Sequence, residues 1–279
     1  AREILSLYHD VGALCQEAHR VVVSEDRPVH FVVASIEQVE LFANYVLTLD
    51  ELEVWVPSLL VVNLDFSALK ACRALGQRTR LLLACVAPRE CHHSDGRRLD
   101  RCPTPEPPAP GTPELGMLYY TANWYRPALL QLLLDLGAPA ALYSDADVVF
   151  LRGLQDDFFS ASSSRLQVMC EAYDTGHNIS FWMQGGVVFA AAPAAEVVGR
   201  WLTAWGALDA LDGLTNELYA VRDRHDDYTC LSVIDFHNMG NGLTAAPERM
   251  VALHISEGVG QLEKVARMRM LGLWRGGAG

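Results

Sequence analysis

Short apolar runs alternate with longer amphipathic stretches from residue 29 onward. Two stretches repeat their apolar residues at helical spacing. The first runs from about Ile36 to Asp50, and the second, FSALKACRALG, ends at Gly76. Alternating strands and helices predict an α/β domain with a mostly parallel sheet and helices on both faces. Ligands bind such sheets at the carboxyl ends of the strands, where Ser35 and Asp65 lie. Three runs have the length and continuity of strands buried on both faces: VHFVVA, SLLVVNLD and RLLLACVA.

A proline-rich and charged segment interrupts this pattern between residues 88 and 113. Such a composition cannot form a helix or a central strand, so we expect an exposed loop. The apolar stretch after it predicts a long helix that is closed by Gly137. Because proline is tolerated only near the start of a helix, Pro127 predicts that this helix begins close to Trp124 or Tyr125.

The second half of the chain continues the alternation. A buried strand stops at Ser144, two aspartates follow, and a second apolar run comes next. We expect residues 1–27 to form an N-terminal helical extension, residues 28–274 the α/β domain and residues 275–279 a tail. The later elements are predicted as strands at RLQVMCEA, GGVVFAA and RMVALHI, helices at AAEVVGRWLTAW and near TNELYAVRDRHDDYTCLSVI, and a terminal helix.

Charge and hydropathy narrow the range of partners. The net charge of -12 argues against nucleic acid or an anionic membrane as the main partner. An anionic nucleotide can still bind where a metal ion and a few cations reverse the local field. No apolar run reaches the ~20 residues that span a bilayer. Since the sequence starts with Ala1, we expect membrane attachment only through a segment that is absent from this chain.

The seven cysteines show no spacing that is typical of a zinc site. Cys91 and Cys102 flank a short irregular stretch and could form a disulfide in an oxidising compartment. An odd total leaves at least one thiol unpaired within the chain.

The segment LYSDADVVFLRGL carries the strongest chemical signal. Asp145 and Asp147 stand one residue apart at the end of a buried strand, where a break in the backbone can turn both carboxylates toward one cation. Hard divalent ions such as Mn²⁺ and Mg²⁺ prefer such oxygen ligands. A bound ion of this kind keeps open positions for diphosphate oxygens and neutralises the charge on a departing nucleotide.

Three segments in this order resemble a known family: LYSDADVVFLRGL, WMQGGVVFAAAP and LHISEGVGQLEKVARMRMLGLW. They are similar to the nucleotide-diphospho-sugar transferase domain of plant and algal arabinosyl- and xylosyltransferases. The resemblance implies a GT-A fold, an Asp-x-Asp motif with Mn²⁺, and a retaining glycosyltransferase. It also implies a UDP-sugar donor, a glycan or glycoprotein acceptor and a location in the Golgi lumen.

The resemblance also assigns ligands for the metal and the phosphates. Asp145, Asp147 and His254 match the metal ligands, with Asp145 also facing the donor. Lys264 matches a cation that steadies the departing diphosphate, and Gly258 would let the backbone approach the phosphates closely. On the residues alone, His254 could instead be a satisfied histidine at a strand end and Lys264 a solvated lysine.

Further positions match the part of the family that binds the donor. Arg126 matches a basic residue that reaches the donor, with a surface arginine as the alternative. Ser35 and Asp65 are candidates for binding the donor, Asp65 through its nucleoside, although Asp65 could equally cap a helix. Gln184 and Gly185 match the polar segment that lines the sugar site, where a turn is the alternative.

One departure from the family pattern concerns catalysis. Related retaining enzymes often have an Asp-Gln pair where this chain has Asp227 and Tyr228. Asp227 and Gln184 are therefore the catalytic candidates, and a non-catalytic protein that binds a nucleotide sugar or glycan is an alternative. A phosphatase of the haloacid-dehalogenase type is a second alternative, but its Asp-x-Asp normally follows the first strand of the core.

Overall fold

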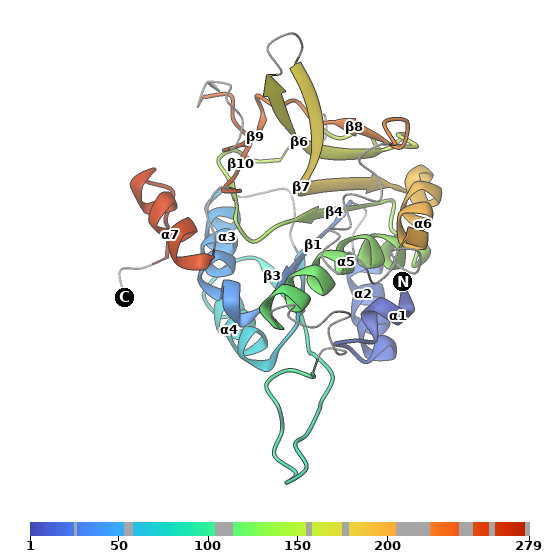
Figure 1. Cartoon of the computed structure of the whole chain (residues 1–279), viewed down its shortest axis with the longest axis vertical. Coiled ribbons are helices and arrows are strands. Elements are labelled where there is room, and N and C mark those ends of the chain that lie inside the picture. The colour runs from blue at the N-terminus through green and yellow to red at the C-terminus, as the bar shows by residue number, and fades with distance from the viewer. Residues whose placement is uncertain are drawn as a thin grey trace.

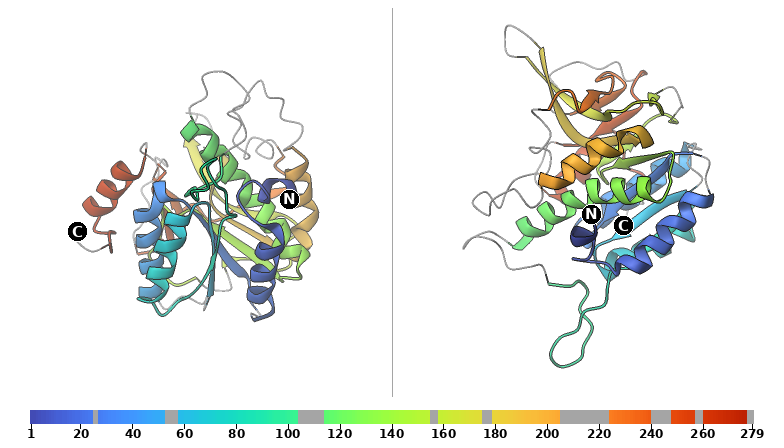
Figure 2. Two further views of the ribbon diagram at one scale, coloured as in Figure 1. Left: turned by 90° about the horizontal axis from the view of Figure 1, so that it is seen from below. Right: turned by 90° about the vertical axis from the view of Figure 1, so that its right-hand side faces the viewer.

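The computed structural model describes residues 1–24, 27–52, 58–103, 114–154, 158–174, 179–204, 224–239, 248–256 and 260–276. They form a central seven-stranded sheet with helices on both faces and a small three-stranded sheet beside it (Figures 1 and 2). This is the mixed α/β architecture that the alternation of apolar runs predicts.

The large sheet has the order β3-β2-β1-β4-β7-β6-β8. Only β7 runs against its neighbours, so the sheet is mostly parallel, as expected. Its strands are β1 (Val29–Ala34), β2 (Ser58–Asn63), β3 (Leu82–Val86), β4 (Ala140–Ser144), β6 (Leu166–Asp174), β7 (Ile179–Ala191) and β8 (Tyr228–Cys230). In the small sheet, β10 (Ala252–His254) lies between β5 (Val148–Phe150) and β9 (Phe236–Asn238).

Two helical layers cover the large sheet. One face packs against α1 (Arg2–Leu5), α2 (Val11–Ser24), α5 (Glu114–Asp135) and α6 (Ala195–Thr203). The other packs against α3 (Val39–Glu51) and α4 (Phe66–Gly76), and α7 (Gln261–Met270) packs against α3. Two short 3-10 helices, η1 (Ile36–Gln38) and η3 (Ala192–Ala194), follow β1 and β7. Figure 2 shows the sheet edge-on between these layers.

Strand β1 shows why continuous apolar runs mark the centre of the sheet. Successive side chains of a strand point to opposite faces. Phe31 and Val33 accordingly belong to the core on the α5 side, whereas Val32 and Ala34 belong to the core on the α3 side. All six residues of β1 are buried, so both faces of the strand need apolar side chains.

The N-terminal extension forms helices, and these pack into the main core. Ile4, Leu14 and Val21 of α1 and α2 are buried in the same cluster as Phe31 of β1. Residues 88–103 form the irregular loop that their composition predicts, and Figure 1 shows it projecting beyond the helices; residues 104–113 lie outside the described part of the chain. Among the described helices, none has both the length and the apolar character needed to cross a membrane.

Helix α5 corrects one prediction. It begins at Glu114, well before Trp124 or Tyr125, and Pro127 lies inside it. A proline in a helix removes one backbone hydrogen bond, but Trp124, Tyr125 and Leu129 are buried in the core on either side of it. This packing offsets the local cost. The predicted end is confirmed, because Gly137 has φ 93° and its N–H donates to the carbonyl of Leu134.

Residues 228–230 correct a second prediction, because they form strand β8 and not part of a helix. Tyr228 and Cys230 pair with Leu166 and Val168 at the edge of the sheet, and Cys230 is joined to Cys170 of β6 by a disulfide. Partners distant in sequence therefore override the local helical pattern. Of the rest of that predicted helix, residues 224–227 and 231–234 are not helical, and residues 215–223 lie outside the described part of the chain.

All seven cysteines are described. The Cys91–Cys102 disulfide confirms the pairing considered from sequence. Two further disulfides, Cys72–Cys85 and Cys170–Cys230, join partners that sequence spacing did not indicate. Cys15 is half-buried and unpaired, in line with the odd total.

Candidate functional site

The turn that follows β4 places both aspartates between the two sheets. The N–H of Asp145 donates to the carbonyl of Gly186 in β7 at 2.9 Å. The carbonyl of Asp147 accepts from the N–H of Ile255, just after β10, at 3.1 Å. Because β5 pairs with β10 and sets Val148 opposite His254, the imidazole arrives directly beside Asp147.

Asp145, Asp147 and His254 form a compact cluster of potential metal ligands. One ligand atom from each lies within 4.8 Å of the others. The Nε2 atom of His254 is 3.3 Å from Oδ1 of Asp147 and 3.7 Å from Oδ2 of Asp145. Two carboxylates and one imidazole suit a divalent cation such as Mn²⁺. The structure therefore brings together all three residues that the sequence suggested as metal ligands.

Lys264, in the first turns of α7, completes one side of the cluster. Its Nζ atom forms an ion pair with Oδ2 of Asp147. Burial by itself would raise the pKa of Asp147, but His254 and Lys264 outweigh it and hold that pKa below its usual range. Gly260 precedes α7 with φ 91°, a conformation that favours glycine. Gly258 lies outside the described residues.

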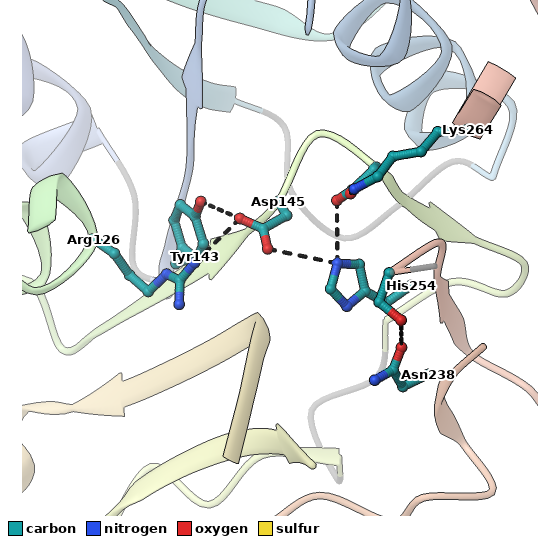
Figure 3. Close-up of polar contacts among 8 residues, drawn as sticks. Arg126, Tyr143, Asp145, Asn238, His254 and Lys264 are labelled. Carbon is teal, nitrogen blue, oxygen red and sulfur yellow. Dashed lines mark hydrogen bonds and ion pairs between the residues drawn. The ribbon is translucent and has the colours of Figure 1, made fainter. Parts of the chain in front are cut away.

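Arg126 and Tyr143 hold the other side of Asp145, opposite His254 (Figure 3). The Nη2 atom of Arg126 is 3.3 Å from Oδ1 of Asp145, and the Tyr143 hydroxyl donates to the same oxygen. The guanidinium also lies 4.6 Å from the centre of the Tyr143 ring. Burial and the nearby negative charge of Asp145 raise the pKa of Tyr143 well above its usual value, so its hydroxyl remains a donor.

Sequence analysis missed Tyr143. The signal was its position two residues before Asp145, since alternate residues of a strand share one face. Arg126 is buried although it belongs to a helix, so the surface arginine considered as its alternative is excluded.

Gly185 and Gly186 make room for the cluster. A Cβ on Gly185 would lie 1.7 Å from Nη1 of Arg126, and a Cβ on Gly186 would lie 2.6 Å from Nδ1 of His254. Neither distance is compatible with a side chain at the glycine. The two glycines therefore allow Arg126 and His254 to pack directly on the β7 backbone. Gln184 precedes them and is partly exposed.

Asp65 and Ser35 lie at the carboxyl ends of β2 and β1, as predicted. The carboxylate of Asp65 accepts from the N–H of Ala68 at 2.7 Å and from that of Ile36 at 2.8 Å. This confirms the helix-cap alternative and fixes the loop after β1 to the start of α4. Ser35 is buried and immediately precedes η1. Donor binding by Ser35 or Asp65 stays a prediction.

Asp227 is not brought to the cluster. It lies at the start of β8, which is separated from β4 by β7 and β6 in the sheet. Its carboxylate accepts from Nη2 of Arg200 in α6 at 2.5 Å, and its carbonyl accepts from the N–H of Leu166 at the beginning of β6. The structure gives the proposed catalytic role of Asp227 no geometric support.

Comparisons with known proteins agree with this fold. Residues 114–203 match the family model described as nucleotide-diphospho-sugar transferase. That segment contains Arg126, both aspartates and the two glycines. A comparison with curated protein sequences gives no match.

Among solved structures, the chain resembles glycosyltransferases with the GT-A fold. Galactosyltransferase LgtC has 10% identity and a TM-score of 0.55, over 88% of this chain and 94% of that one. Mouse xyloside xylosyltransferase 1 has 9% identity and a TM-score of 0.50, over 82% and 97%. The bifunctional glycosyltransferase WbbM has 10% identity and a TM-score of 0.51 over 85% of this chain, which spans only 47% of WbbM. These likenesses confirm the GT-A fold that the resemblance implied.

Proposed function

We propose that this chain is a glycosyltransferase of the nucleotide-diphospho-sugar transferase family, whose model matches residues 114–203. It would transfer a sugar from a UDP-sugar donor to a glycan or glycoprotein acceptor. The observation that carries the proposal is the convergence of Asp145, Asp147 and His254 on one point between the two sheets. That point lies at the carboxyl end of β4, the edge where parallel sheets bind ligands.

Asp145, Asp147 and His254 would hold Mn²⁺ or Mg²⁺, which when bound would offset negative charge on the donor's diphosphate. The chain surrounds this point with two cations, which suit an anionic donor. Lys264 is paired with Asp147, and Arg126 is paired with Asp145 on the opposite side. Arg126 and Lys264 would orient the diphosphate before reaction and stabilise the charge that develops on it.

The stereochemical outcome that we propose is retention, on the basis of the family resemblance. Gln184 stays a catalytic candidate, because in β7 it directly precedes the two glycines that lie against Arg126 and His254. It would position the sugar or the acceptor hydroxyl. Identification of the product anomer by NMR would decide between retention and inversion, and an inverted product would refute this part of the proposal.

Location in the Golgi lumen is also part of the proposal. Three disulfides are characteristic of proteins that fold in an oxidising compartment. Attachment to the membrane would depend on a segment outside this chain. Immunofluorescence of the full-length protein against Golgi markers tests the location, and a cytosolic signal would contradict it.

Calorimetric binding of UDP, with and without Mn²⁺, is the decisive experiment. The native chain is expected to bind UDP in a metal-dependent way, and Asp147→Asn should lose that dependence. Asp95→Asn is the matched control, because Asp95 is paired with Arg97 in the exposed loop, far in sequence from the cluster. Metal-independent binding, or equal loss in both variants, would refute the metal assignment. Screening UDP-sugars for transfer would follow.

Specific observations argue against the two alternative functions, a non-catalytic binder and a phosphatase. Tyr228, the residue that favoured a non-catalytic binder, lies on β8, away from the cluster. Its hydroxyl is hydrogen-bonded to Nδ1 of His225. Its presence therefore removes no group from the metal cluster. The phosphatase interpretation has no support from the fold, whose similar structures are glycosyltransferases.

A further inference from the structure

A buried polar triad lies beside the turn that carries Asp145 and Asp147. Its members are His30 of β1, Tyr45 of α3 and Ser144 of β4, and all three are 0% exposed. The Nε2 atom of His30 is 2.8 Å from Oγ of Ser144 and 2.7 Å from the Tyr45 hydroxyl. The hydroxyls of Tyr45 and Ser144 are also hydrogen-bonded to each other. Side-chain hydrogen bonds thus join β4 to β1 and α3, which lie about a hundred residues earlier in the sequence.

This triad stands in an apolar environment. Tyr45 belongs to the core cluster that also contains Val46, Leu142 and Phe150. Burial lowers the pKa of His30 to about 3, so the ring is neutral and the triad contains no ion pair. Apolar side chains of the same shape could fill such a space at little or no cost in stability. What a hydrogen-bonded polar triad adds is a unique arrangement of its members, because hydrogen bonds are directional.

The triad contacts both strands that flank the Asp-x-Asp turn. On the near side, Ser144 is the last residue of β4 and is covalently joined to Asp145. On the far side, Phe150 of β5 packs against both other members. Its ring centre lies 6.0 Å from that of His30, edge to face, and 6.0 Å from that of Tyr45. His30 and Tyr45 therefore contact both the residue before the turn, Ser144, and the strand after it, through Phe150.

We propose that His30, Tyr45 and Ser144 are positioning residues that set the geometry of the Asp145-Ala146-Asp147 turn and so the affinity of the metal site. The proposal rests on the proposed function, because it presupposes that the turn binds a divalent cation. The triad touches neither the cation nor the donor. It acts through the backbone of Ser144 and through the packing of Phe150, which leave the turn one conformation.

Two substitutions remove hydroxyls of the triad and keep most of the packing. Tyr45→Phe retains the ring that contacts Phe150, and Ser144→Ala removes a single oxygen. Tyr125→Phe is the matched control, because the Tyr125 hydroxyl is also buried and makes three hydrogen bonds, to Leu5, Tyr8 and His9. Those partners belong to the N-terminal helical region and not to the metal cluster.

The experiment measures Mn²⁺ affinity by electron paramagnetic resonance at a temperature where every variant is folded, together with the melting temperature. All three variants should melt at a lower temperature than the native chain. Only Tyr45→Phe and Ser144→Ala should bind Mn²⁺ more weakly, by up to about tenfold, the lower end of the effect of outer-shell partners. Their bound Mn²⁺ should also give a broadened spectrum, which a uniform loss of stability would not produce.

Three results would overturn the proposal, and they are distinguishable. If the native chain binds Mn²⁺ and the triad variants bind it equally well, the triad has only a structural role and the proposed function stands. If the native chain binds no Mn²⁺, the proposed function and this inference fail together. An equal loss of Mn²⁺ affinity in Tyr125→Phe would likewise contradict a specific role for the triad.

Discussion

The Nδ1 atom of His254 lies 2.6 Å from the place that a Cβ would occupy on Gly186. A methyl group at this position must push the imidazole away from Asp147 or shift β7. We therefore expect Gly186→Ala to weaken Mn²⁺ binding at least about tenfold, as loss of ligand support does in other metal sites. Calorimetric titration with Mn²⁺ measures the change.

Gly199→Ala provides the control for that substitution. Gly199 lies inside α6, and its new Cβ would have ordinary contact with Gln131 at 3.6 Å. Alanine is favoured over glycine within a helix by about 0.5–1 kcal/mol, so this variant should be slightly more stable and bind Mn²⁺ normally. Unchanged affinity in Gly186→Ala would show that His254 is not a ligand.

Lys264→Met separates binding of the metal from binding of the nucleotide. The ammonium group of Lys264 is paired with the carboxylate of Asp147, so it repels a metal cation that binds the same carboxylate. Without nucleotide, the variant should bind Mn²⁺ as tightly as the native chain or more tightly. With Mn²⁺ present, UDP should bind about tenfold or more weakly, the usual effect of losing a charged hydrogen bond. Calorimetry with each ligand distinguishes these effects, and a loss of Mn²⁺ affinity would contradict them.

Two buried histidines predict a loss of stability at mildly acidic pH. Burial lowers the pKa of His9 to about 4 and that of His30 to about 3. Between these values and 6.5 the unfolded chain binds more protons than the folded one. The contribution of these histidines to the free energy of unfolding is thus fully present above pH 6.5. It falls as the pH drops, by about 1.4 kcal/mol per pH unit for each histidine.

Urea unfolding between pH 7 and pH 5 measures this slope. Most carboxylates contribute little in this window, because their usual pKa values lie near 4. Burial raises the pKa of Asp65, which opposes the slope equally in the native chain and in the variant. His9→Gln should reduce the slope by about half, whatever its effect on stability at pH 7. A slope that is the same in the variant would refute the assignment to His9.

The disulfides predict a thiol count and an order of importance. Unfolded without reductant, the chain should expose one reactive thiol, Cys15. Removal of Cys170–Cys230 should cost about 4 kcal/mol, and removal of either shorter loop about 3 kcal/mol, because the unfolded-chain entropy grows with loop length. The sequence separations are 60 for Cys170–Cys230 and 13 and 11 for the others. Paired Cys→Ser variants and a thiol assay test both statements; three or more reactive thiols would contradict the pairing.

Local sequence patterns predicted helices with clear end signals and strands that are buried on both faces. Strands β1, β2 and β4 are continuous apolar runs, and α4 ends at Gly76 as expected. Predictions failed where distant contacts decide. Pro127 lies within α5 because Trp124 and Leu129 are buried around it. Residues 228–230 form a strand because β6 and Cys170 are their partners.

Residues of the candidate site were likewise found where a local motif marks them and missed where distant contacts decide. A short motif after an apolar run was enough to find Asp145 and Asp147, and the family resemblance added His254 and Lys264. Tyr143 was missed because a buried tyrosine in a strand looks like any core residue. The position of Asp227 depends on the pairing of β6 with β8, which no local pattern contains.

The proposed ligands come from two different sheets. Asp145 and Asp147 follow β4 of the large sheet, whereas His254 ends β10 of the small one. A shared cation would therefore act as a reversible cross-link between the two sheets, closing a long loop of chain as a disulfide does. Chelation should then raise the hydrogen-exchange rates of β9, β10 and α7 before those of β1 and β4. The ion that binds the donor would in this way also set how stably the small sheet and α7 are held against the large sheet.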